Sequence, residues 1–137
     1  MNIFFDVDYT ILSMDGALRP HVVEVFQKLK EDGHDLYIWS GVGMRTEVVR
    51  RFKLGPYISN IYVKPLSDHI SEMTRMGIDP FPDFCVDDHQ EIIDALGGMR
   101  VRAFTFWREI EDHEMLKVYE TIREFSQNNS KGTESTK

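Results

Sequence analysis

Cysteine, long apolar runs and excess positive charge are all scarce in this sequence of 137 residues. Cys85 is the only cysteine, so an internal disulfide is excluded and a reducing compartment is expected. No apolar run approaches the roughly 20 residues of a membrane-spanning helix. The first residues, Met-Asn-Ile-Phe-Phe-Asp, lack the basic region and cleavage site of a signal peptide. We therefore expect a cytoplasmic protein without a membrane partner.

The charge balance is acidic, with a formal net charge of −7. General nucleic-acid binders carry a basic face, so nucleic acid is a disfavoured partner, although a short basic groove is compatible with this balance. Hydrophobic residues make up 42% of the chain and fall in short runs. This composition and length predict one globular domain with its own core.

Short apolar segments alternate with amphipathic ones along the chain. Strands are predicted over residues 2–6, 36–39, 61–63, 84–86 and 101–106, and helices over 20–33, 44–52, 67–76, 89–96 and 114–125. This alternation across short loops predicts a three-layer α/β/α sandwich with a five-stranded parallel sheet. The domain should cover residues 1–126, and the polar composition of residues 127–137 predicts a disordered tail.

Four of the predicted strands end in reactive polar groups. These are Asp6-Val7-Asp8, Ser40-Gly41, Lys64 and Asp87-Asp88. Because ligands of parallel sheets bind beyond the carboxyl ends of the strands, these groups should meet at one site.

The chemistry of these groups suits phosphoryl transfer. A carboxylate such as Asp6 can attack a phosphoryl group and form an aspartyl-phosphate, while Asp8 handles protons. Mg²⁺ prefers oxygen ligands, which Asp6 and one of Asp87 and Asp88 would supply. Lys64 and the Ser40 hydroxyl would hold the remaining phosphoryl oxygens.

Each group also has an ordinary interpretation. Asp87 and Asp88 before a helix are typical N-cap residues, and Ser40-Gly41 is a common turn. A calcium-binding EF-hand loop is excluded, because Ile11 stands where the invariant glycine belongs and Ala17 where the bidentate glutamate belongs. It is the order of all four groups, on four strand ends, that favours a catalytic site.

These residues resemble the four motifs of the haloacid dehalogenase superfamily, over residues 1 to about 106. Asp6-Val7-Asp8-Tyr9-Thr10 resembles motif I, Ser40-Gly41 motif II, Lys64 motif III and Asp87-Asp88 motif IV. The resemblance implies a strand order of 5-4-1-2-3 and a Mg²⁺-dependent phosphatase. Dehalogenases of the family lack the second aspartate of motif I, so the presence of Asp8 favours phosphatase chemistry.

The resemblance also implies a role for each residue of motif I. Asp6 would be the nucleophile and a metal ligand. Asp8 would protonate the leaving group and then activate water, and its backbone carbonyl would bind the metal. Thr10 would brace the turn after the nucleophile.

The other motifs would complete the site. Ser40, Gly41 and Lys64 would hold the phosphoryl group, and Lys64 would also steady Asp6. Asp87 would be a further ligand of Mg²⁺, supported by Asp88.

Two features depart from the family pattern. Tyr9 stands where the family usually has glycine, which places a bulky ring near the site. The segments between the motifs are also too short for a cap domain. Capless members of the family act on large substrates or borrow a cap from another subunit, so a second copy of this chain is a candidate partner.

Two alternative functions stay open at this stage. Val86-Asp87-Asp88-His89-Gln90-Glu91 looks like the motif IV region of polynucleotide kinase-phosphatases, which suggests a nucleic-acid 3′-phosphatase, with His89 facing the substrate. A non-catalytic phosphate-binding regulatory module is the other alternative.

Overall fold

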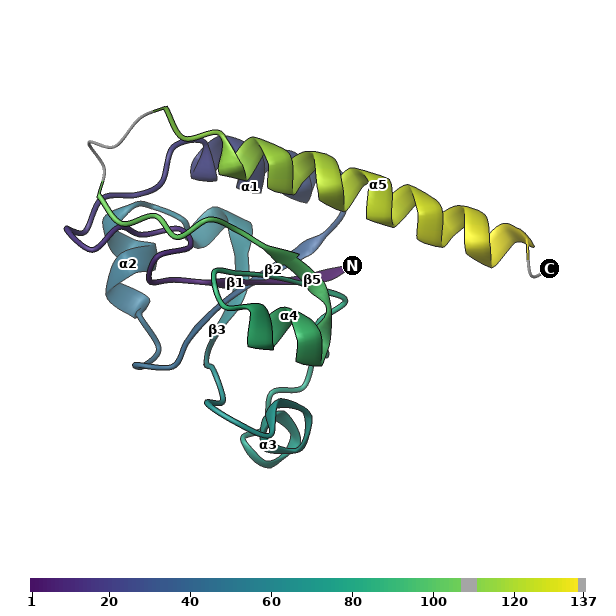
Figure 1. Ribbon diagram of the computed structural model, residues 1–137, viewed down its shortest axis with the longest axis horizontal. Helices are drawn as coiled ribbons and strands as arrows, with labels where there is room; N and C mark the ends of the chain where they lie inside the picture. Colours follow the sequence, from purple (N-terminus) through teal and green to yellow (C-terminus); the bar gives the residue numbers. More distant parts are fainter. Residues whose placement is uncertain (107–110, 136–137) are drawn as a thin grey trace.

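A computed structural model describes residues 1–106 and 111–135 as alternating strands and helices (Figure 1). The strands are β1 (Asn2–Asp6), β2 (Asp35–Ser40), β3 (Ile58–Val63), β4 (Phe84–Asp87) and β5 (Gly98–Arg100). The helices are α1 (Val22–Glu31), α2 (Thr46–Arg51), α3 (His69–Arg75), α4 (Gln90–Leu96) and α5 (Glu114–Ser135), with a short 3₁₀ helix η1 (Gly55–Tyr57) before β3.

The five strands form one parallel sheet in the order β3-β2-β1-β4-β5. This order confirms the predicted one, 5-4-1-2-3, seen from the other edge. The central strand β1 lies in register with β2, from Asn2 opposite Asp35 to Asp6 opposite Trp39. The fold is therefore a Rossmann-like α/β sheet whose middle strand carries Asp6 at its carboxyl end.

Alternate residues of β1 face opposite layers, as the pleat of a strand requires. Ile3 and Phe5 belong to the larger core, which α1, α2 and α5 help to cover. Phe4 belongs to the smaller core, together with residues of α3 and α4 such as Met73 and Ile92. Figure 1 shows α1 and α5 lying together above the sheet and α3 and α4 below it. None of the described helices is long and apolar enough to cross a membrane.

The fifth strand was predicted at the wrong place. The sheet uses Gly98–Arg100, whereas residues 101–106 are irregular. The N–H of Val101 donates to the carbonyl of Asp87 in β4, and beyond it the backbone of the segment pairs with loops and side chains. The N–H of Arg102 donates to a Glu114 carboxylate, and that of Phe104 donates to the Tyr9 carbonyl. Val101 and Phe104 are nevertheless buried, which explains why the sequence of the segment resembles a strand.

A glycine is required where β5 begins. Gly98 has a φ of +126°, and a Cβ at this position would lie 1.9 Å from the carbonyl oxygen of Cys85. Glycine alone tolerates such a close backbone approach. The last helix also differs from expectation: α5 runs to Ser135, past residue 127, where the polar tail was predicted to begin.

A buried ion pair joins the beginning of the chain to its end. The Arg19 side chain is fully buried, and its Nε lies 2.9 Å from Oδ1 of Asp112. The same oxygen of Asp112 accepts the N–H of Glu114, the first residue of α5. Arg19 also donates to the carbonyls of Thr10 and Arg102. One guanidinium thus fixes the loop after β1, the segment after β5 and the start of α5.

Replacing Asp112 by asparagine should destabilise the fold by about 3 kcal/mol at pH 7, because it leaves the buried charge of Arg19 uncompensated. Burial opposes ionisation of Asp112, but Arg19 outweighs it, so the pKa of Asp112 is lowered. Its stabilisation is therefore present above the unfolded pKa of about 3.9 and is lost as the pH falls through the folded pKa.

Urea unfolding of the wild type and the Asp112→Asn variant at pH 7 and near pH 3 measures this effect. The difference between the two proteins should shrink at the lower pH. Asp79→Asn, at an exposed position, is the matched control. A difference that persists unchanged at low pH would contradict the electrostatic explanation.

Candidate active site

Three charged side chains from separate strands meet at the carboxyl edge of the sheet. The Nζ of Lys64, just after β3, lies 3.0 Å from Oδ1 of Asp6 and 3.1 Å from Oδ2 of Asp87. Asp6 and Asp87 end β1 and β4, and all three residues are buried. Parallel strands end on the same side of a sheet, which is why residues so distant in the sequence converge here.

The chain turns sharply directly after Asp6. The carbonyl of Val7 accepts the backbone N–H groups of Thr10, Ile11 and Leu12. This turn places the Thr10 hydroxyl 3.2 Å from Oδ2 of Asp6 and 3.3 Å from Oδ1 of Asp88. The Thr10 hydroxyl therefore links Asp6 to Asp88, whereas the backbone bonds to Val7 hold the turn itself.

Tyr9 adopts a left-handed backbone conformation with a φ of 65°. Such a conformation favours glycine, because a side chain there costs roughly 1–2 kcal/mol. Two backbone hydrogen bonds hold Tyr9 in place: its N–H donates to Leu12 at 2.8 Å, and its carbonyl accepts from Phe104 at 2.7 Å. The departure from glycine at this position is thus accommodated by the surrounding loops.

The Ser40-Gly41 turn follows β2 and lines the same cavity as Asp6. The Ser40 hydroxyl accepts the N–H of Val42 at 3.3 Å, and the Ser40 carbonyl accepts the N–H of Lys64 at 2.9 Å. A Cβ on Gly41 would lie 2.6 Å from Cδ2 of Leu66, so a larger residue would displace that side chain.

The cluster holds more negative than positive charge. Burial and the neighbouring Asp87 raise the pKa of Asp6 to about 7, although Lys64 opposes this rise. Burial also raises the pKa of Asp87, again against the effect of Lys64. Burial disfavours the charged form of Lys64, but the two carboxylates outweigh it and raise the pKa of Lys64. One ammonium does not balance two carboxylates in this buried setting.

One group of side chains in the described residues could hold a metal ion. Asp87, Asp88 and His89 place one ligand atom each within 4.8 Å of one another, and Asp6 contacts this group through the Thr10 hydroxyl. Carboxylate oxygens near a pocket open to water match the preference of Mg²⁺, which keeps several waters. A dication would also supply the positive charge that the buried carboxylates lack.

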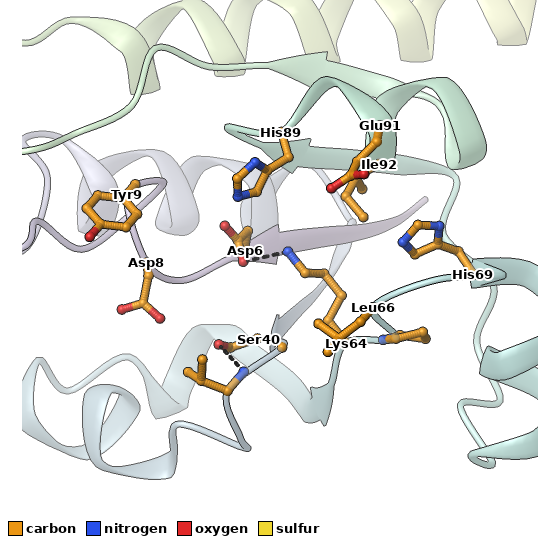
Figure 2. A pocket seen from close by; sticks show the side chains of 13 residues that line it. Asp6, Asp8, Tyr9, Ser40, Lys64, Leu66, His69, His89, Glu91 and Ile92 are labelled. Atoms are coloured by element: carbon orange, nitrogen blue, oxygen red, sulfur yellow. Dashed lines mark hydrogen bonds and ion pairs between the residues drawn. The ribbon is translucent and has the colours of Figure 1, made fainter.

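Asp8 faces a different partner from Asp6. Its carboxylate forms an ion pair with Arg45, which also bonds Glu47 at 2.8 Å. Asp8 remains 39% exposed and lines the pocket (Figure 2), so it is accessible to a bound molecule. Sequence reasoning missed Arg45, because it belongs to no motif and reaches Asp8 only through the fold.

These side chains surround a pocket of about 350 Å³ (Figure 2). The pocket brings together the predicted residues Asp6, Asp8, Ser40, Gly41 and Lys64. Three other predicted residues do not line it: Asp87 contacts Lys64, Thr10 contacts Asp6, and Asp88 contacts Thr10. Two further lining residues, Tyr9 and His89, were also expected near the site from the sequence. The remaining lining residues were not assigned to the site by sequence reasoning: Val42, Pro65, Leu66, His69, Glu91 and Ile92. They come from the loops after the strands and from the first turns of α3 and α4, where spacing carries little signal.

A scan against known protein families finds no match to this chain, and a search of curated proteins finds none either. The fold and the geometry of the site therefore carry the functional argument.

The raised pKa of Asp6 predicts that the metal-free protein loses stability as the pH rises. A carboxyl whose folded pKa lies above its unfolded pKa of about 3.9 binds its proton more tightly in the folded state. Between about pH 4 and pH 7, unfolding free energy should therefore fall by an amount on the order of 4 kcal/mol, since the folded pKa of Asp6 is about 7.

Denaturant unfolding in EDTA at pH 5 and pH 8 tests this prediction. Asp6→Asn should abolish most of the fall, because an amide does not titrate, whereas Asp79→Asn should leave it unchanged. Equal stability of the wild type at both pH values would show that Asp6 ionises without cost.

Proposed function

We propose that this chain is a Mg²⁺-dependent phosphatase of the haloacid dehalogenase type that hydrolyses a phosphate monoester through an aspartyl-phosphate on Asp6. The observation that supports it most is the meeting of Asp6, Lys64 and Asp87 at the carboxyl edge of the sheet, beside an open pocket. The order of the four motif-like segments in the sequence supports the same assignment.

In the first step, a carboxylate oxygen of Asp6 forms a bond to phosphorus as the bond from phosphorus to the ester oxygen breaks. Asp8, in its acid form, gives its proton to the departing oxygen. In the second step, water attacks phosphorus, gives a proton to Asp8, and releases phosphate and the free carboxylate of Asp6. Asp8 returns to its acid form, so the cycle closes.

Ser40 and Lys64 would hold the phosphoryl oxygens while these bonds change. The ammonium of Lys64 also keeps Asp6 fixed for attack, since it bonds Oδ1 at 3.0 Å. Asp6, Asp87 and the Asp8 backbone carbonyl would hold Mg²⁺, with Asp88 in support. The bound ion would neutralise charge between the phosphoryl group and the Asp6 carboxylate.

Asp6→Asn should reduce hydrolysis to the background rate, because the amide does not act as the nucleophile. The variant should remain folded, since it removes a carboxyl whose ionisation is opposed by burial. Phosphate release from a panel of monoesters, with Mg²⁺ and with EDTA, measures this effect beside the Asp79→Asn control.

Turnover that requires Mg²⁺ and disappears in the Asp6→Asn variant is the expected result. Binding of Mg²⁺ and phosphate without turnover of any ester would instead favour a phosphate-binding module.

Asp8→Asn should slow the hydrolysis of an ester more when its leaving group must be protonated to depart. Loss of a general acid costs about 10²–10⁴-fold in rate for a leaving group that must be protonated. An alkyl phosphate should therefore slow by about that factor, whereas 4-nitrophenyl phosphate, whose leaving group departs as a stable anion, should slow much less in its first step. Steady-state and burst kinetics on the two esters separate the steps. Equal slowing of that first step for both esters would assign Asp8 a structural role.

A further inference from the structure

An exposed apolar surface forms the rim of the pocket. Leu66 and Val42 are the two most exposed large apolar side chains in the described part of the chain, at 78% and 76%, and both line the pocket. Val42 follows β2 and Leu66 follows β3, and Leu66 packs closely over Gly41. Each of the two loops therefore presents an exposed apolar side chain to the pocket that Asp6 lines, and we call this pair, Val42 and Leu66, the apolar rim (Leu66 is labelled in Figure 2).

Two more exposed apolar side chains lie close to the rim in the sequence, and one buried apolar side chain lines the cavity from α4. Met44, after β2, is 52% exposed, and Ile70, at the start of α3, is 56% exposed. Ile92 lines the pocket from α4, and Figure 2 shows its side chain and that of Leu66 bordering the same cavity. Exposed apolar side chains that gather in one place mark a binding surface, whereas single ones scattered over a protein do not.

The charges of the pocket restrict what this surface binds. Lys64 is the only lysine or arginine among the described residues that line the pocket, and it is already bonded to Asp6 and Asp87. Two more carboxylates, Asp8 and Glu91, line the cavity. Within this pocket, the part of a substrate beyond its phosphoryl group would therefore meet two carboxylates and the imidazoles of His69 and His89, but no lysine or arginine other than Lys64 among the described lining residues.

We propose that the apolar rim binds the leaving group of the substrate, and that this group is uncharged and apolar, as in an alkyl or aryl phosphate monoester. This inference rests on the proposed phosphatase activity and names the class of substrate for the same site. The phosphoryl group is then the only anionic part of the substrate. Sugar phosphates are disfavoured because their hydroxyl groups lose water at the rim, and bisphosphates and nucleic-acid ends because of their additional charge.

The test compares substrates of matched reactivity. Hexyl phosphate and glucose 6-phosphate are both esters of primary alcohols, so differences between them report recognition. Fructose 1,6-bisphosphate and a 3′-phosphorylated oligonucleotide add charge. We expect kcat/KM for hexyl phosphate to exceed that for each of the others by about tenfold or more, mainly through a lower KM.

Two substitutions test the rim itself. Val42→Ser and Leu66→Ser should each raise KM for hexyl phosphate by about tenfold and reduce its preference over glucose 6-phosphate. The two substitutions lie in different loops, so an effect seen with both cannot come from a local rearrangement of one loop. Phe81→Ser is the matched control, because Phe81 is a 50% exposed apolar residue before β4, near the amino ends of the strands.

The outcomes distinguish this inference from the proposed function. Phosphatase activity that is equal or greater on glucose 6-phosphate, on the bisphosphate or on the oligonucleotide would overturn the inference alone. So would a preference that neither substitution changes. A dimer in sedimentation that Leu66→Ser dissociates would assign the rim to a second copy of the chain. Absence of turnover on every ester, in the wild type as in the Asp6→Asn variant, would overturn both proposals.

Discussion

A single buried ammonium, shared by two buried carboxylates, ties the carboxyl edge of the sheet together. Lys64 follows β3, yet it bonds Asp6 on β1 and Asp87 on β4, so it reaches past β2. Either carboxylate without this partner would carry an uncompensated buried charge, which typically costs about 3–5 kcal/mol. The positions of three strand ends are therefore coupled to one side chain, and the walls of the pocket follow from those positions.

The same cluster lowers the stability of this edge of the sheet. Two carboxylates and one ammonium leave an excess of negative charge, and burial raises the pKa of Asp6 to about 7. A hydrophobic set of side chains would pack there without such a penalty. Carboxyl groups with shifted pKa values are common at functional sites. Catalysis needs such shifts, although the buried charges that cause them destabilise the fold. The proposed metal ion would relieve the imbalance that the protein alone leaves in place.

The sequence predicted best those features that follow from hydrophobic periodicity and from the residues at strand ends. Alternation of strands and helices predicted the parallel sheet, and the resemblance supplied the strand order that the structure confirms. The convergence of Asp6, Lys64 and Asp87 follows from that topology, although their hydrogen bonds do not. The position of the fifth strand was wrong because Val101 and Phe104 are buried in an irregular segment, whereas Gly98, with no side chain to signal a strand, fits against Cys85.

Long-range polar contacts were beyond sequence reasoning for a different reason. Arg19 and Asp112 are separated by most of the chain, and nothing in their neighbours distinguishes a fully buried arginine from a solvated one. Arg45 is similar, because its pairing with Asp8 depends on how two loops approach each other. Such pairs form only once the sheet has fixed its loops, so they depend on the fold and cannot be found from local pattern.

Strained backbone conformations occur in the loops that surround the candidate site. Among the described non-glycine residues with left-handed backbones, Tyr9, Arg45 and Asp68 lie in the loops that follow β1, β2 and β3. Each such conformation costs roughly 1–2 kcal/mol and persists only where the surroundings fix it. Tyr9 lines the pocket and Arg45 bonds Asp8, so two of the three act on the site directly. The cost is concentrated on the side of the sheet where the carboxylates meet, which is the arrangement expected when loops are held rigid for binding.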